Sequence, residues 1–286
     1  MNRKAQFNRI LIIQSLEVGL TGKRLYEDLN TLTLCKDHVV RVELCDVASK
    51  QDLLSLLDSI PTRMAAEDIL PILHFEVHGS SKRDGIVLSS GDLVSWADLR
   101  APMTAINIAS QFNLIVCFAA CHGAGFVSTL TPKARSPCWA MLGPKEEVDD
   151  GVMLVDFTEM YKCILDGGTG DEAVDILNRS LPVGQAPYMF TTAEVFFEWS
   201  WNVYCEKRCT YEGRKDLTKE VIKELRRNNR SDRIPQRNDL MKQFSERVLP
   251  EVKNRSLELF FMADLFPANS ERFSLDKNRL LCAAER

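Results

Sequence analysis

The sequence predicts an α/β protein with a mainly parallel sheet, helices on both faces and a helical C-terminal extension. Strand-like and helix-like segments alternate over the first two-thirds of the 286 residues. The strands are continuous apolar runs, as is typical of strands buried on both faces. From Phe196 onward the pattern is helical. We therefore expect a core over residues 1–190 and a helical annex over residues 191–286 that packs on it.

The first half of the core alternates strands and helices. Ile10–Ser15 is a β-rich apolar run, and Lys23–Leu34 has the spacing of an amphipathic helix. Val39–Val47 is the second expected strand, and Leu53–Leu57 marks the next helix. Ile72–Val77 is a third apolar run, expected as a buried strand.

The second half of the core continues the alternation. A small hairpin is expected over Gly85–Trp96, with its turn at Ser90-Gly91, and then a helix over Ala97–Ala109. Asn113–Ala120 is the most apolar strand of the chain. A short strand over Trp139–Leu142 and a helix over Val152–Leu165 complete the predicted core.

The composition excludes several protein classes. Hydrophobic residues make up 45% and charged residues 27%, with a net charge of -4, which is ordinary globular composition and disfavours direct nucleic-acid binding. No apolar run approaches the roughly 20 residues that span a bilayer, and no export signal precedes the first strand. The nine cysteines are scattered and odd in number. We therefore expect a cytoplasmic protein with reduced thiols that does not bind a membrane.

Two residues that could form a catalytic pair directly follow buried strands. His78 comes after Ile72–Val77, and Cys121 comes after Asn113–Ala120. Because the carboxyl ends of parallel strands meet at one edge, both side chains are expected there. An imidazole can deprotonate a thiol and later protonate a leaving amine. The backbone N–H groups of Gly79 and Cys121 are the expected oxyanion hole.

Around this pair the sequence resembles the caspase-like cysteine peptidases, and within them the CHAT group. LHFEVHGS at Leu73–Ser80 and LIVCFAACHGA at Leu114–Ala124 look like the His-Gly and Ala-Cys-x-Gly motifs of that superfamily. The intervening hairpin and Trp96–Leu99 are also similar, and the resemblance covers roughly residues 9–180. It implies a caspase-like fold, His78 and Cys121 as the catalytic dyad, and peptide cleavage without a metal or organic cofactor.

The resemblance leaves the specificity of cleavage open. Many relatives with basic specificity have Asp two residues before the nucleophile, and caspases have Gln-Ala-Cys, whereas this chain has Ala119-Ala120-Cys121. An acidic segment supplies Glu146, Glu147 and Asp149 before the helix at Val152. Its residues are expected either to cap that helix or to line the pocket for a basic substrate residue.

Other patterns give weaker hypotheses. His74 and His78 have helical metal-ligand spacing, but on a strand they would lie roughly 13 Å apart. Cys205-x-x-x-Cys209 lacks a second ligand pair, so no metal site is expected. Residues 201–255 hold 15 basic and 9 acidic side chains, which favours a solvated helix face over a nucleic-acid site.

The sequence therefore predicts a regulated cysteine endopeptidase that cleaves a protein substrate. The resemblance implies a role in prokaryotic signalling, cell death or antiviral defence, triggered by an activating partner protein or complex. The alternative is a catalytically silent binding or scaffold module with the same fold. A nucleic-acid-binding regulator is the third hypothesis, and it lacks a recognisable reading helix.

Overall fold

The computed structural model describes residues 6–18, 20–35, 39–179, 187–227, 242 and 248–273. The chain divides into two compact units. Unit 1 comprises residues 1–130 and 136–193, and unit 2 comprises residues 131–135 and 194–286.

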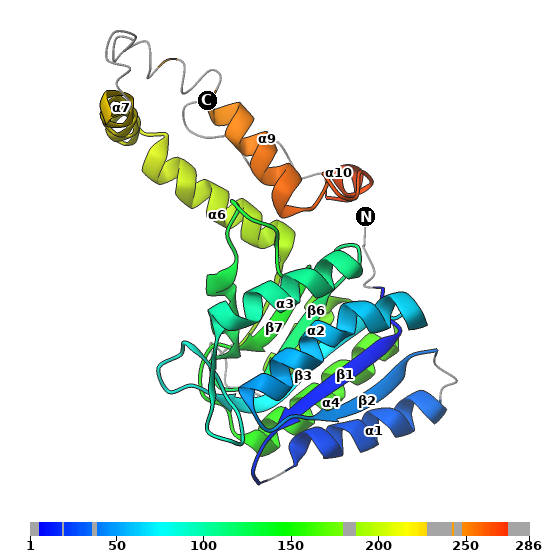
Figure 1. The fold of residues 1–286 in the computed structure, drawn as a ribbon. Coiled ribbons are helices and arrows are strands. Elements are labelled where there is room, and N and C mark those ends of the chain that lie inside the picture. The colour runs from blue at the N-terminus through cyan, green and yellow to red at the C-terminus, as the bar shows by residue number, and fades with distance from the viewer. Residues whose placement is uncertain are drawn as a thin grey trace. The chain divides into compact units, whose positions relative to one another are not determined.

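Unit 1 is an α/β structure with a mixed, mostly parallel sheet (Figure 1). The strand order along the main sheet is β2-β1-β3-β6-β7-β8, and a small β4–β5 hairpin extends from the end of β3. All neighbours on the main path are parallel except β7 and β8. The strands are β1 (Arg9–Ser15), β2 (Arg41–Asp46), β3 (Pro71–Gly79), β4 (Gly85–Val87), β5 (Leu93–Ser95), β6 (Ile115–Ala119), β7 (Ala140–Pro144) and β8 (Tyr188–Thr192). The predicted α/β class with a mainly parallel sheet is confirmed.

Helices cover both faces of this sheet. In Figure 1, α2 and α3 lie on the side of the sheet that faces the viewer, and their apolar residues share a core cluster with Leu73, Phe75 and Phe118. On the other face, Phe157 of α4 contacts His74 of β3. The unit 1 helices are α1 (Thr21–Cys35), α2 (Lys50–Glu67), α3 (Trp96–Ala109), the 3-10 helix η1 (Gly123–Thr129), α4 (Asp150–Leu165) and α5 (Gly170–Arg179). Burial on both sides explains the long apolar runs of β1, β6 and β7.

Unit 1 has three elements that the sequence does not predict, namely β8, α5 and the 3-10 helix η1. The edge strand β8 runs antiparallel to β7, with Ala140 opposite Thr192. Its residues read YMFTT, too short a run to give a clear alternating pattern. Helix α5 follows the positive-φ residue Gly167. Elsewhere the predicted strands lie within one or two residues of their observed positions.

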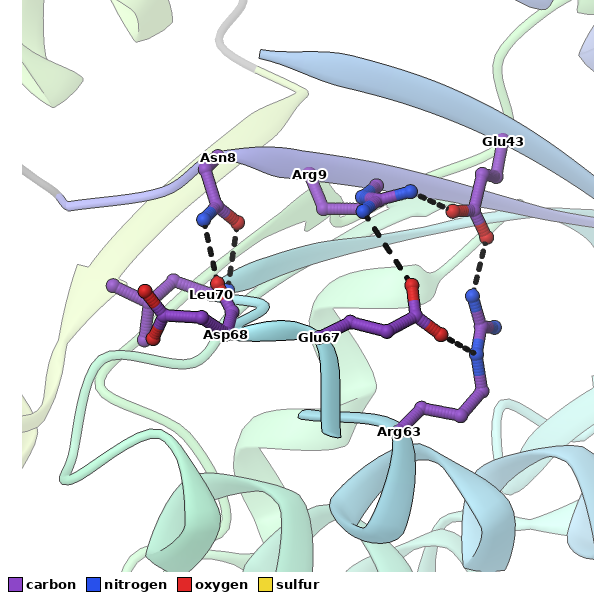
Figure 2. Close-up of polar contacts among 7 residues, drawn as sticks. All are labelled: Asn8, Arg9, Glu43, Arg63, Glu67, Asp68 and Leu70. Carbon is purple, nitrogen blue, oxygen red and sulfur yellow. Dashed lines mark hydrogen bonds and ion pairs between the residues drawn. The ribbon is translucent and has the colours of Figure 1, made fainter. Parts of the chain in front are cut away.

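An ion-pair cluster ties the amino ends of β1 and β2 to α2 (Figure 2). The Glu43 carboxylate on β2 accepts from Arg9 on β1 and from Arg63 Nη2 on α2, the latter at 2.7 Å. Glu67 lies 3.7 Å from Arg9 and 3.6 Å from Arg63. Figure 2 also shows Asn8 bonded to the backbone of the segment that precedes β3. These contacts fix the strand register at the end of the sheet opposite His78.

A second charged contact at α3 gives a pH-dependent prediction. Asp98 closes a capping box with Ser95, and Lys50 Nζ lies 2.8 Å from Asp98 Oδ2. The hydrogen bonds from Lys50 and Ser95 lower the pKa of Asp98 from 3.8 to about 2. The Asp98 carboxylate therefore stabilises the fold above about pH 4, and this contribution is lost as the pH falls through the lowered pKa.

We expect Asp98→Asn to lower the free energy of unfolding at pH 7 by about 1 kcal/mol, the usual value of a lost cap. The loss should shrink as the pH falls to about 3. At that pH the Asp98 carboxyl group of the unfolded wild-type chain is mostly protonated, whereas that of the folded protein is still mostly ionised, so the carboxylate stabilises the fold less. Urea unfolding of both proteins at the two pH values measures this difference. An equal loss at both values would contradict the assigned direction of the pKa shift.

The described part of unit 2 is helical and holds an aromatic core. Its helices are α6 (Ala193–Arg208), which starts at the last residue of unit 1, α7 (Tyr211–Arg227), α9 (Leu249–Phe260) and α10 (Asn269–Arg272). The Phe197 ring lies 5.3 Å from that of Phe260 and 5.5 Å from that of Phe261. Arg135 donates two 2.7 Å hydrogen bonds to the Asp264 carboxylate, which holds segment 131–135 within this unit. The rest of the predicted annex lies outside the described residues.

The structure bears on two sequence-based expectations, one about membrane-spanning segments and one about the cysteines. No helix among the described residues is long and apolar enough to cross a bilayer. Cys205 is disulfide-bonded, so the expectation of reduced thiols throughout is wrong at that position. The described cysteines of unit 1 are free thiols.

Candidate functional site

The first predicted site residue, His78, is the penultimate residue of β3. Side chains alternate along a strand, so His78 projects from the same face as His74 and Glu76, the face covered by α4. His74 and Glu76 are buried, whereas His78 is exposed. The strand therefore carries its last polar side chain out of the core and into solvent at the carboxyl edge of the sheet.

The second predicted site residue, Cys121, lies in a tight turn that ends β6. Gly123 N–H donates to Ala120 O at 2.9 Å, which closes the turn. His122 has φ 59° and ψ 20°, the left-handed conformation that a type II turn requires at its third residue. Cys121 is the second residue of the turn and is partly exposed.

Close backbone contact brings the two motifs together. Strands β3 and β6 are parallel neighbours, with Glu76 opposite Ala119. Gly79 is three residues beyond Glu76 and Cys121 is two beyond Ala119, and an ideal Cβ built on Gly79 would lie 1.8 Å from Cys121 O and 2.7 Å from the Cys121 carbonyl carbon. Only glycine fits at position 79 while the turn keeps its place. His78 is therefore the sequence neighbour of Gly79, the residue whose backbone contacts the backbone of Cys121.

The thiol itself makes a different hydrogen bond. Cys121 Sγ donates to Val148 O at 3.8 Å. Within the described part of the chain, no hydrogen bond joins Cys121 to His78. The structure therefore brings the two predicted catalytic residues next to each other, with the thiol proton directed at a carbonyl group instead of the imidazole.

The two N–H groups expected in the oxyanion hole belong to residues whose backbones are in contact. Ser80 N–H donates to Gly85 O, which makes Ser80 and Gly85 a hydrogen-bonded pair of the β3–β4 ladder. Gly79 and Ile86 are then a non-hydrogen-bonded pair, so the Gly79 N–H points away from β4. Among the described residues, Cys121 N–H donates to no backbone or side-chain acceptor.

Glycines also let other segments approach the turn. A Cβ on Gly123 would lie 2.5 Å from Phe118 Cβ, and one on Gly125 would lie 2.8 Å from Trp96 Nε1. A Cβ on Gly143 of β7 would lie 3.0 Å from the Gly123 carbonyl carbon. The turn that carries Cys121 is therefore packed against β6, α3 and β7, and its position is fixed.

The acidic residues predicted to bind substrate have three different roles. Asp149 Oδ1 accepts from Gly151 N and Val152 N, so this carboxylate caps α4, as the helix-capping interpretation expects. Glu146 accepts from His122 N–H through its backbone carbonyl at 3.2 Å. Glu147 Oε1 lies 3.8 Å from His122 Nε2, and its side chain is 84% exposed. Both glutamates are exposed, so a basic group could approach their carboxylates from solvent.

A buried polar network beneath the dyad was not predicted from the sequence. Glu76 Oε1 lies 2.9 Å from His74 Nε2, and Glu76 Oε2 accepts from Thr21 Oγ1 at 2.7 Å. His74 Nδ1 lies 3.0 Å from Tyr161 Oη. The only sequence signal was a glutamate inside an apolar strand, because such a residue needs partners when buried. The network ties β3 to α1 and α4, and it satisfies His74 as a structural residue.

Burial sets the chemistry of the other thiol near the site. Cys117 is buried and hydrogen-bonded to Tyr161, and burial raises its pKa to about 12. Burial also raises the pKa of Tyr161 well above its usual value. Cys117 is therefore held as a neutral thiol in the core, which agrees with the interpretation of this residue as packing. Among the described residues, no three His, Cys, Asp or Glu side chains form a group that could hold a metal ion.

Comparison with known proteins gives no identification. No model of a known protein family matches the chain, and no curated protein is significantly similar to it.

Proposed function

We propose that the protein is a cysteine endopeptidase of the caspase-like, CHAT-type kind, with Cys121 as nucleophile and His78 as general base and then acid. The observation that carries this proposal is the contact of Gly79 with the Cys121 backbone. It sets an exposed imidazole and a partly exposed thiol on adjoining segments at one edge of the sheet. The resemblance of both motifs to those peptidases supports the same roles.

The proposed reaction uses these groups in two steps. His78 takes the thiol proton, and Cys121 Sγ attacks the scissile carbonyl carbon to form a tetrahedral oxyanion. The N–H groups of Gly79 and Cys121 stabilise that oxyanion. The imidazolium then protonates the leaving amine, which leaves a thioester. Water, deprotonated by His78, hydrolyses the thioester, releases the acid product and restores the thiol.

A peptidyl acyloxymethyl ketone tests this function, since it alkylates only a thiol that can act as a nucleophile towards a bound peptide. The probe is added to the purified protein and to the protein mixed with extract of its own cells, which supplies any activating partner. Labelling should fall on Cys121 and disappear in His78→Ala. Labelling spread over all exposed cysteines, or its absence in both samples, would contradict the proposal.

Substrate preference is the next part of the proposal. Glu147 is exposed beside the turn, and Glu146 is one residue closer to β7, so a basic residue before the scissile bond is favoured. Fluorogenic peptides that end in Arg should be cleaved faster than those that end in Asp, and Glu147→Gln should reduce the difference. A preference for Asp would rule out this role.

A second candidate function is a binding or scaffold module without catalysis. The hydrogen bond from Cys121 Sγ to Val148 O favours it, since the thiol proton is not shared with His78. The same bond is equally expected of a latent peptidase that awaits a trigger. Labelling of Cys121 by the peptide probe in cell extract separates the two, because a scaffold has no need of a reactive thiol.

The cellular role follows from the resemblance alone. A cytoplasmic, regulated peptidase in prokaryotic signalling, cell death or antiviral defence would act on a protein substrate after an activating partner binds. The helical unit 2 is the proposed docking site for that partner, because the dyad and the oxyanion donors all belong to unit 1.

A further inference from the structure

We propose that His122 is a positioning residue that fastens residues 145–148, here called the strap, over the nucleophile turn. In doing so it controls when the Cys121 thiol can meet His78. The inference rests on the proposed function, because it concerns the encounter of the same two side chains. It assigns a role to the histidine that the dyad does not use.

His122 makes three contacts with the strap through its backbone N–H and its imidazole. Its backbone N–H donates to Glu146 O at 3.2 Å, and its Nδ1 lies 3.1 Å from Lys145 O. A carbonyl oxygen only accepts, so Nδ1 carries the hydrogen and donates it. Nε2 lies 3.8 Å from Glu147 Oε1. The imidazole is 7% exposed, so it is enclosed by the segment that it holds.

The strap has separate anchors at its two ends. Lys145 N–H donates to Pro187 O at the start of β8. At the other end, Asp149 caps α4 through its carboxylate. Between these anchors His122 supplies the hydrogen bonds to Lys145 and Glu146, and Val148 O receives the Cys121 thiol. Cys121 and His122, the two central residues of the turn, therefore hold the middle of the strap. His122 makes most of these contacts.

The backbone conformation of His122 supports a role for its side chain. At φ 59° any residue other than glycine is strained, by roughly 1–2 kcal/mol. Glycine would fill this turn position without strain, but it would lack the imidazole that reaches Lys145 and Glu147. The strain persists because the enclosed side chain holds the strap.

This arrangement explains why the dyad is adjacent but not hydrogen-bonded. While the strap is fastened, the thiol proton is directed at Val148 O. When His122 releases the strap, the Val148 carbonyl group moves away from the Cys121 thiol. The imidazole of His78, on the adjoining segment, can then accept the thiol proton. A substrate or partner that engages the strap would thereby complete the catalytic pair.

The experiment measures alkylation of individual cysteines by iodoacetamide at pH 7 in the full-length protein, followed by mass spectrometry. His122→Gly keeps the turn conformation and removes the imidazole. We expect it to speed alkylation of Cys121 about fivefold, the factor that one lost hydrogen bond of ordinary strength allows. The buried Cys117 and Cys138 should stay unmodified. An unchanged or slower rate at Cys121 would overturn the proposal.

Glu147→Gln is the second variant. If Cys117 and Cys138 become alkylated in His122→Gly, that variant has lost its fold, and Glu147→Gln then tests the role of the strap. The Glu147 side chain is largely solvent-exposed, so we expect this variant to fold normally. We expect about a twofold faster alkylation of Cys121, in line with the loss of a weak surface ion pair. Glu159→Gln on α4 makes the same charge change away from the strap and serves as control. Equal rates in the Glu147 and Glu159 variants would contradict the role of the strap.

Alkylation requires no peptidase turnover, so the two proposals fail separately. Faster alkylation in the strap variants, with no labelling by the peptide probe, would keep the role of His122 and remove the peptidase. Probe labelling of Cys121 with no effect of either strap variant would keep the peptidase and remove the role of His122.

Discussion

Cys121→Ala is expected to abolish peptide hydrolysis, with a loss of at least about 10³-fold in kcat/KM. Cys121 Sγ is the protein atom that forms a covalent bond to the substrate in the proposed reaction, and no neighbouring group can replace it. The fold should be unaffected, because the thiol is partly exposed and its one hydrogen bond is the long contact to Val148 O. We expect the free energy of unfolding to change by less than about 1 kcal/mol.

The matched control is Cys163→Ala, which removes another partly exposed free thiol, on α4. It should retain full activity. Cleavage of the best fluorogenic peptide and urea unfolding are measured for both variants beside the wild-type protein. Hydrolysis that persists in Cys121→Ala would assign the nucleophile elsewhere, and an equal loss in both variants would indicate a general effect on the fold.

Gly79→Ala is expected to have the largest effect among changes that leave the dyad side chains intact. The added Cβ would meet Cys121 O at 1.8 Å, and neither backbone can yield without moving the strand or the turn. We expect a loss of about 3 kcal/mol in the free energy of unfolding. A displacement of the turn by about 1 Å should also lower kcat/KM about 10²-fold.

Gly91→Ala separates this contact from ordinary backbone strain. Gly91 has φ 84° and no atom within 4 Å of a built Cβ, so alanine there adds only conformational strain, about 1–2 kcal/mol. Activity should not change. Urea unfolding and peptide cleavage report both effects. If Gly79→Ala proves no worse than Gly91→Ala in both measurements, the two backbones are not in the contact described.

The arrangement of the sheet could be predicted from local patterns. Ile72–Val77 is buried, as is Ile115–Ala119, and each segment is mostly apolar, so the ends of both strands are easy to locate. The placement of His78 and Cys121 at one edge then followed from parallel pairing alone. The turn at Ser90-Gly91 was predictable because Gly91 takes a positive φ.

The contacts that complete the site depend on tertiary structure and could not be predicted. The hydrogen bond from Cys121 to Val148 joins segments 27 residues apart. The partners of Glu76 come from α1 and from its own strand. No sequence pattern indicated a role for His122, because its contacts with the strap depend on where β7 ends.

The central claim is that His78 accepts the proton of Cys121, and the pH dependence of Cys121 alkylation tests it most directly. Iodoacetamide reacts with the thiolate, and both proteins compared carry His122→Gly, so that the strap no longer directs the thiol proton at Val148 O. The account predicts that His78→Gln slows alkylation at least about tenfold near pH 6.5, and that the two rates converge at high pH. Superimposable rate profiles across the whole range would contradict it.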